Sequence, residues 1–317
     1  MSCVNICLDK NTVNGYLYIE LVNLKNMKNK KIEMKILSLF DGMSCGQLAL
    51  KKAGIKYDKY FASEIDKYAS KVATDNFPNT INLGNVKSIS GVNLPEIDLL
   101  LAGSPCQGFS SAGKKLGFED DRSKLFFEFL RILKEVKPTY FLLENVKMSK
   151  ENQDAISQEL GVEPLSINSS LFSAQNRNRL YWSNIPNINR KIRDSNIGWG
   201  DIRQFNVESN FYYSRKGLAW IAQREKKTGK KLSIWADNDK CQMIEASHWK
   251  SYSNQRFFGI KDKNGLRYIT PIECERAQTV PDNYTSSVSN SQRYKMLGNG
   301  WTVDLIAYLL KGIKKEK

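Results

Sequence analysis

Histidine is almost absent from this sequence, and its cysteines are few and irregularly spaced. The 317 residues contain one histidine, His248, and six cysteines, none of them in a Cys-x-x-Cys pair. A zinc site built from histidine and cysteine is therefore not expected, and neither is catalysis by a Ser-His or Cys-His pair. We expect no metal, and a functional cysteine would need activation by other groups.

Long apolar runs are also missing. No stretch approaches the roughly 18 apolar residues that a membrane helix needs. The first 24 residues lack the basic start, apolar block and small-residue cleavage site of a signal peptide. The sequence therefore predicts a protein that acts in the cytoplasm and does not bind a membrane.

Acidic residues are outnumbered by basic ones. The chain has 48 Lys and Arg against 33 Asp and Glu, which gives a formal net charge of +15. Such an excess favours a polyanionic partner such as nucleic acid. A lysine-rich composition from an AT-rich genome explains the same excess equally well, so charge alone does not decide between the two.

From Lys35 onward, short apolar strands alternate with helical patterns. KILSLF, YDKYFASE, IDLLLAG and TYFLLEN have the composition of strands, and the last two contain continuous apolar runs, as strands buried on both faces do. GQLALKKAG, DKYASKVATDNF and RSKLFFEFLRILKEVKP have helical spacing. This order predicts an α/β fold with a doubly wound, mostly parallel sheet that binds ligands at the carboxyl ends of its strands.

Two features near the first strands suit a cofactor. The turn Phe40–Gly46 leads into a helix N-terminus, where backbone N–H groups can approach an anionic group. Glu64 ends the next strand, where a carboxylate can accept hydrogen bonds from ribose hydroxyls. A surface turn and a solvated acid explain this spacing equally well.

Four further residues suit chemistry at the same edge of the sheet. Cys106 lies in GSPCQGFS, a loop that offers exposure, although most free cysteines are buried and structural. Glu144 ends an apolar strand, where a carboxyl needs a partner or a proton-transfer task. Arg177 and Arg179 lie two apart on a strand and point to one face, which suits a base carbonyl or a phosphate as well as plain surface charge.

In this order, these segments resemble the motifs of the DNA (cytosine-5) methyltransferase family. ILSLFDGMSCG is similar to the first cofactor motif, in the form typical of de novo enzymes, and SEID to the second. SPCQGFS resembles the catalytic Pro-Cys loop, LLENV the Glu-Asn-Val motif and SAQNRNRLYW the QxRxR motif. RYITPIECERAQTVPDNY resembles the segment that ends the target recognition region, and MLGNGWTV the final motif.

The resemblance implies a Rossmann-like, S-adenosylmethionine-dependent enzyme that methylates C5 of a cytosine flipped out of a specific duplex DNA sequence. Cys106 would attack C6, Glu144 would bind the ring edge and help to protonate N3, and Arg177 and Arg179 would hold the base. The positions that match the family's cofactor contacts are Phe40, Asp41, Gly42, Met43, Glu64, Ile65, Asn85, Val86, Ser104, Asn299 and Val303.

The sequence departs from the family pattern at a few of these positions. Asn85 stands where an acid often contacts the adenine amino group, and its amide oxygen can accept the same bond. Ser44 and Cys45 stand where bacterial members usually have glycines, and Trp301 stands where a small residue is common. These departures concern the fit of the cofactor rather than the reaction.

The resemblance also divides the chain. We expect an N-terminal extension at residues 1–34, a catalytic and cofactor-binding domain at 35–186, a target recognition domain at 187–265, and a return to the catalytic domain with a C-terminal helix at 266–317. A monomer acting on double-stranded DNA is expected, with a cognate restriction endonuclease as a further partner. The candidate DNA contacts are Gln107, Ser110, Arg190, Arg193, Arg215, Arg224 and Lys250.

Three other hypotheses for the function remain open at this point. A tRNA cytosine-5 methyltransferase of the same fold would share the motifs, and the large basic segment before residue 267 favours duplex DNA over it. A catalytically inactive DNA-binding relative would not need Cys106, Glu144 and Arg177 together. A dinucleotide-dependent oxidoreductase would leave the Pro-Cys loop unexplained, and the sequence lacks its GxGxxG motif.

Overall fold

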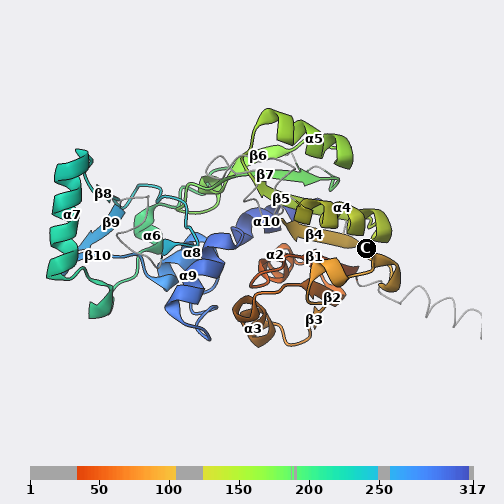
Figure 1. The fold of residues 1–317 in the computed structure, drawn as a ribbon, viewed down its shortest axis with the longest axis horizontal. Helices are drawn as coiled ribbons and strands as arrows, with labels where there is room; N and C mark the ends of the chain where they lie inside the picture. Colours follow the sequence, from red (N-terminus) through yellow and green to blue (C-terminus); the bar gives the residue numbers. More distant parts are fainter. Residues whose placement is uncertain (1–33, 105–123, 187, 189–190, 249–257, 314–317) are drawn as a thin grey trace, which may run out of the picture. The chain divides into compact units, whose positions relative to one another are not determined.

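A computed structural model describes residues 34–104, 124–186, 188, 191–248 and 258–313. Seven strands form one sheet in the order β3-β2-β1-β4-β5-β7-β6 (Figure 1). The first five pair in parallel, and β7 runs antiparallel to both β5 and β6. This confirms the predicted α/β fold with a mostly parallel sheet. The strands are β1 (Met34–Leu39), β2 (Tyr57–Ser63), β3 (Ile81–Asn82), β4 (Leu99–Gly103), β5 (Tyr140–Val146), β6 (Leu165–Asn168) and β7 (Asn178–Ser183).

Both faces of the central strands are buried, which explains their continuous apolar sequences. Alternate residues of a strand point to opposite faces, so Leu99 and Leu101 pack into one hydrophobic cluster and Leu100 and Ala102 into the other. The first cluster includes helices α2 (Cys45–Ala53) and α10 (Val303–Leu310). The second includes α4 (Lys124–Val136), whose face carries Phe126, Phe129, Leu130 and Ile132.

The helix ends follow local signals in the sequence. α2 ends at Gly54, which adopts a left-handed conformation with φ of 68°. α3 (Lys67–Asn76) begins after Asp66, whose carboxylate accepts hydrogen bonds from the backbone N–H groups of Tyr68 and Ala69. α5 (Lys150–Leu160) has a weaker apolar pattern, because Ile156 is its one fully buried hydrophobic residue.

Beyond β7 the chain forms a smaller unit before it returns to the large sheet (Figure 1). Its three-stranded sheet has the order β10-β9-β8, with β8 and β9 parallel and β9 and β10 antiparallel. The elements of this part are α6 (Trp199–Ile202), α7 (Arg215–Thr228), β8 (Ser233–Ile234), β9 (Phe258–Asp262), β10 (Gly265–Arg267), α8 (Pro271–Ala277) and α9 (Asn290–Asn299). Short 3-10 helices lie at Val86–Ser88, Gly91–Asn93, Ser169–Leu171 and Ser209–Phe211.

Within the described residues, no helix combines the length and the apolar character that crossing a membrane requires. The same part of the chain holds no group of three or more His, Cys, Asp or Glu side chains arranged to bind a metal ion.

Candidate active site

A cavity of about 400 Å³ opens at the carboxyl ends of β1, β2, β4 and β5. Parallel strands end at the same edge of a sheet, so residues far apart in the sequence meet there. Segments of α9 and of the connection to α10 close the cavity from the other side. The predicted site residues that line it are Phe40, Asp41, Gly42, Met43, Glu64, Ile65, Asn85, Val86, Ser104, Glu144, Arg177, Arg179 and Asn299.

The turn after β1 is tightly folded. Phe40, Gly42 and Ser44 all have positive φ angles, of 57°, 61° and 66°. Glycine adopts this conformation without the steric cost that a side chain brings, which gives a physical reason why glycine is usual at the position of Ser44. A Cβ on Gly46 would lie 2.5 Å from the Tyr60 hydroxyl, so the start of α2 packs directly against β2.

Glu64 is fixed at the rim of the cavity by main-chain groups. Its Oε2 accepts the Gly42 N–H at 2.8 Å, and its Oε1 accepts the N–H groups of Ile65 and Asp66 at 2.8 and 2.7 Å. Oε2 keeps a further lone pair for a ligand. The Ile65 side chain beside it is 77% exposed, which offers apolar surface to a planar ring.

Asp41, which lines the same cavity, has a buried carboxylate oxygen without a partner among the described residues. Its Oδ1 accepts the Tyr60 hydroxyl at 2.7 Å, while its Oδ2 is buried and has no hydrogen-bond partner among the described residues. Burial raises the pKa of Asp41 to about 6. A buried acceptor without a partner is costly, so this oxygen suits a positively charged ligand group.

Glu144 is held between two donors. Arg179 Nε lies 3.0 Å from Glu144 Oε1, and Trp301 Nε1 donates to Glu144 Oε2 at 3.3 Å. Gly103, at the end of β4, is the register partner of Glu144 on β5. The loop that contains Cys106 therefore begins at the strand beside the carboxylate.

Asn145 has a role that the sequence pattern did not reveal. Its side-chain amide donates to Ser104 Oγ at 2.9 Å, and both residues are buried. Its Oδ1 accepts the backbone N–H of Val146 at 2.8 Å. The bond between Asn145 and Ser104 ties the end of β5 to the first residue after β4. A buried amide directly after Glu144 is the signal that could have indicated this role.

Arg177 lines the cavity, but its guanidinium binds main-chain carbonyls. Nη1 donates to the carbonyls of Ile244 and Gly298, and Nη2 donates to those of Gly298 and Gly300. The end of α9 packs directly against the backbone of Ala246 at Gly298, because a Cβ on Gly298 would overlap that backbone. Arg177, which directly precedes β7, therefore joins the large sheet to Ile244 and to the end of α9, and the two arginines of the motif differ in what they contact.

Two predicted cofactor contacts have other partners in the structure. Asn85 lines the cavity, but its Oδ1 accepts the Lys87 N–H at 3.1 Å and so caps the following 3-10 helix. Val303 does not line the cavity: its side chain is fully buried in the core at the start of α10. Its backbone N–H donates to the Gln278 carbonyl at 3.0 Å.

Five predicted residues lie outside the described part of the chain. They are Cys106, Gln107, Ser110, Arg190 and Lys250. Among the described residues, the one cysteine that lines the cavity is Cys45. Burial raises the pKa of the Cys45 thiol to about 12, so the reactive thiolate is disfavoured there.

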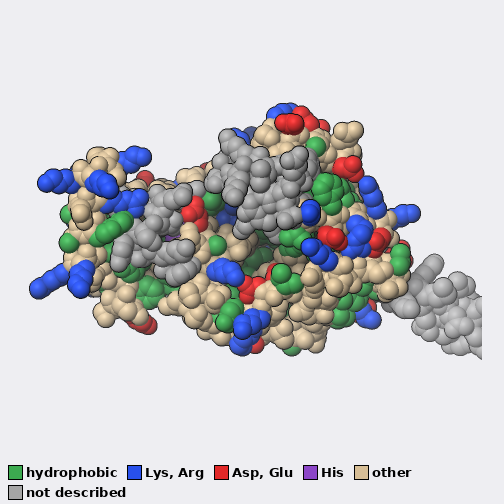
Figure 2. All heavy atoms as spheres, in the orientation of Figure 1, with side chains coloured by type: hydrophobic (Ala, Val, Ile, Leu, Met, Phe, Trp, Pro, Cys, Tyr) green, Lys and Arg blue, Asp and Glu red, His purple; other side chains and the backbone are tan. Residues whose placement is uncertain are grey.

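The predicted DNA contacts that the structure does describe are surface residues of the smaller unit. Arg193 and Arg215 are exposed, and Arg215 begins α7. The Arg224 guanidinium lies over the Trp220 ring, 5.3 Å from its centroid. Figure 2 shows Lys and Arg side chains gathered at the left, where Figure 1 places α7. The other exposed cations in and directly after α7 are Lys216, Lys226, Lys227, Lys230 and Lys231.

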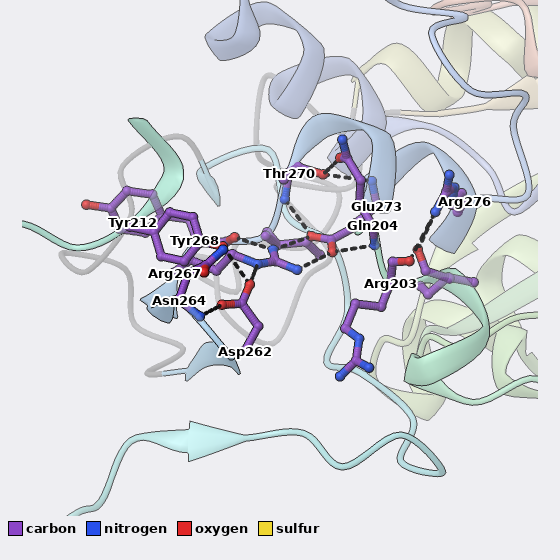
Figure 3. A network of polar contacts seen from close by, with 12 residues as sticks. Arg203, Gln204, Tyr212, Asp262, Asn264, Arg267, Tyr268, Thr270, Glu273 and Arg276 are labelled. Carbon is purple, nitrogen blue, oxygen red and sulfur yellow. Dashed lines mark hydrogen bonds and ion pairs between the residues drawn. The ribbon is translucent and has the colours of Figure 1, made fainter. Parts of the chain in front are cut away.

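A buried charge network joins the small sheet to α8 (Figure 3). The Arg267 guanidinium lies between Asp262 Oδ2, at 2.9 Å from Nε, and Glu273 Oε1, at 2.7 Å from Nη2. The Glu273 carboxylate also accepts the backbone N–H groups of Gln204 and Thr270. Thr270 and Glu273 form a capping box at the start of α8, and the Thr-x-x-Glu spacing is the sequence signal for it.

The chain matches the family model described as C-5 cytosine-specific DNA methylase, over residues 34–181 and 166–315. The chain belongs to this family. The type II methyltransferase M1.ScrFI of Lactococcus lactis subsp. cremoris is 33% identical, with 90% of this chain and 79% of the relative covered. The type II methyltransferase M.NlaX of Neisseria lactamica is 31% identical, with 88% and 96% covered.

A solved structure supports the fold. The Entamoeba histolytica methyltransferase EhMeth superposes with a TM-score of 0.74 at 17% identity, and 89% of this chain and 99% of that chain are covered. Membership of the family confirms that this methylase is an enzyme, that DNA cytosine is its target and that S-adenosylmethionine is its methyl donor.

The cavity fits S-adenosylmethionine in size and charge. Its volume of about 400 Å³ lies within the usual range for small-molecule sites. The unpartnered Oδ2 of Asp41 suits a cationic group of the cofactor, and the fixed Glu64 carboxylate suits hydroxyl donors. The exposed Ile65 side chain provides an apolar contact for the adenine ring of the cofactor.

Proposed function

We propose that this methylase converts cytosine to 5-methylcytosine in a specific duplex sequence through a covalent bond between Cys106 and C6 of the flipped base. The pairing of Gly103 with Glu144 carries the proposal, because Cys106 follows Gly103 by three residues in the sequence and Glu144 is already flanked by an arginine. We therefore propose that Cys106 and Glu144 act on the same base.

In this proposal, each residue has one task. The Cys106 thiolate forms a bond to C6, the π electrons of the C5=C6 bond shift to C4–C5, and N3 takes a proton from Glu144 in its protonated form. S-adenosylmethionine, when bound, supplies a methyl group to the nucleophilic C5. Loss of the C5 proton to a base and departure of Cys106 as the thiolate then restore the C5=C6 bond, and N3 returns its proton to Glu144, which leaves neutral 5-methylcytosine.

We assign different tasks to the two arginines of the motif. Arg179 holds Glu144 and contacts the base, because its Nε already reaches that carboxylate. Arg177 positions the wall of the cavity, because its donors are taken by the carbonyls of Ile244, Gly298 and Gly300. From the sequence we expected both arginines to hold the base, whereas this proposal gives that task to Arg179 alone.

We propose residues 187–265 as the target recognition domain, between a catalytic domain at 35–186 and the returning segment 266–317, with residues 1–34 as an extension. Phosphate contacts position a protein on DNA and base contacts give sequence preference, and the exposed cations of α7 suit the first task. Action in the cytoplasm, a monomeric state and a cognate restriction endonuclease stay predictions.

Bisulfite sequencing tests the function. A plasmid is incubated with the full chain and S-adenosylmethionine, with the Cys106→Ala variant as the control. Protected cytosines in one short sequence context, absent with the control, are the expected result. Methylation by Cys106→Ala would contradict the role of Cys106. If no cytosine is protected, the chain acts on RNA or is a catalytically inactive relative, and the same assay on tRNA separates the two.

A further inference from the structure

Trp301 lies in the connection between α9 and α10 and reaches the end of β5. Its ring is 9% exposed, and its indole N–H points to Glu144 Oε2 at 3.3 Å. The ring fits there because Gly103 has no side chain: a Cβ on Gly103 would lie 2.7 Å from Trp301 Nε1. The segment before α10 is thus hydrogen-bonded to the end of β5 and packed against the end of β4.

Arg179 alone does not fix the carboxylate of Glu144. It contacts Oε1 through Nε, which leaves the carboxylate plane free to turn about its last side-chain bond, where glutamate has a broad torsional preference. A second donor on Oε2, from a different segment of the chain, restricts that rotation. A carboxylate that is oriented before the base arrives does not need to reorganise during the reaction.

We propose that Trp301 is a positioning residue that orients the Glu144 carboxylate toward the flipped base. The proposal rests on the proposed function of Glu144. Trp301 acts through this carboxylate rather than on the reacting atoms, and Gly103 provides the space for its ring. A purely structural Trp301 would also fill the core, but the loss of its N–H alone would then leave the reaction unchanged.

Nuclear magnetic resonance of indole ¹⁵N–H groups tests the contact without any need for activity. The chain contains six tryptophans, and the Trp301→Phe variant assigns the Trp301 signal. Glu144→Gln replaces the charged acceptor with a weaker one, so the Trp301 proton signal should move upfield. Trp182 is the internal reference, because its Nε1 donates at 3.0 Å to Ser157 rather than to a group of the cavity. A Trp301 signal that does not move would overturn the proposal.

Single-turnover kinetics with the full chain test the consequence. Trp301→Phe keeps a ring but removes the N–H, and should slow methyl transfer about tenfold, the effect expected for one hydrogen bond to a charged group. DNA affinity should change less than twofold. In the Glu144→Gln background the same substitution should have no further effect, because coupled residues are not additive. Equal effects in both backgrounds would overturn the positioning role.

Two more variants complete the design. Trp182→Phe removes an indole hydrogen bond elsewhere in the same sheet and should leave the rate of methyl transfer unchanged. Gly103→Ala should slow transfer in the wild-type chain and have a smaller effect beside Trp301→Phe, because the smaller ring relieves the overlap. A wild-type chain that methylates no DNA overturns the proposed function, whereas an active chain with an unmoved Trp301 signal overturns this inference alone.

Discussion

Two acid–arginine pairs, one at the cavity and one under the small sheet, have similar geometry and different surroundings. Arg179 lies 3.0 Å from Glu144, and both side chains are 10% exposed. Arg267 lies 2.7 Å from Glu273, and both side chains are fully buried. The Glu273 carboxylate accepts four hydrogen bonds, from the Arg267 guanidinium twice and from the N–H groups of Gln204 and Thr270.

The two carboxylates differ in how many further hydrogen bonds they can accept. Among the described residues, Glu144 has one donor on each oxygen, and it lines a cavity, so it keeps acceptor capacity for a substrate. Glu273 is saturated by the protein, so it can serve only the fold. Under the proposed function Glu144 takes part in the reaction, whereas Glu273 joins the small sheet to α8, and the variants below are expected to separate the two.

The largest expected effect is at the cavity. Glu144→Gln keeps the size of the side chain and removes its proton-transfer capacity, so single-turnover methyl transfer should fall by about 10²–10⁴-fold. The melting temperature should change little, because the amide can still accept from Arg179 and Trp301. Quench-flow kinetics and calorimetry measure the two quantities. Turnover near the wild-type rate would remove the role assigned to Glu144.

For the Arg267–Glu273 pair we expect the substitution to lower stability, in contrast to the pair at the cavity. Arg267→Ala leaves Glu273 and Asp262 without their shared partner, and breaking a buried pair in this way costs about 3–5 kcal/mol. Denaturant unfolding should show this loss. Lys134→Ala, which removes a solvent-exposed pair with Glu159, is the matched control and should leave the midpoint unchanged. Equal stability of the two variants would show that the Arg267 network does not stabilise the fold.

The third prediction concerns pH. Burial raises the pKa of Asp41 to about 6, above its unfolded value, so the ligand-free fold loses stability from this group as pH rises through 6. A cationic cofactor reverses the sign, because it favours the carboxylate. The affinity for S-adenosylmethionine should therefore increase about tenfold between pH 5 and pH 7. Calorimetric titration measures this, and an equal slope in Asp41→Asn would contradict it.

The smallest expected effect is on α7. If Arg215 contacts a phosphate, Arg215→Ala should reduce the salt dependence of DNA binding by about one unit of slope and weaken all sequences alike. Fluorescence anisotropy at several salt concentrations measures the slope. A selective loss of the cognate sequence would instead identify Arg215 as a base contact.

The sequence predicted the part of the site that depends on regular elements. Continuous apolar strands fix which residues stand at the carboxyl edge, so Asp41, Glu64 and Glu144 were predictable from their positions at strand ends. The predicted helix near the C-terminus is α10. The sheet order places β4, which ends shortly before Cys106 in the sequence, beside β5.

Contacts between distant segments were not predictable. The partners of Arg177 lie 67 to 123 residues away along the chain, and nothing in the QxRxR pattern distinguishes it from Arg179. The bond from Trp301 to Glu144 depends on the space above Gly103, which appears only once the strands are paired. Val303 matches a position that contacts the cofactor in the family, but its side chain is buried in the core.

The identity of the nucleophile is the central claim, and one measurement tests it directly. A duplex with 5-fluorocytosine at the target position traps the covalent adduct, because fluorine cannot leave C5 as the proton does. Tryptic digestion of the trapped complex separates the peptide 88–114, which contains Cys106, from the peptide 36–51, which contains Cys45. Mass spectrometry should find the nucleotide on peptide 88–114. A nucleotide on peptide 36–51, or no adduct with an active enzyme, would contradict the account.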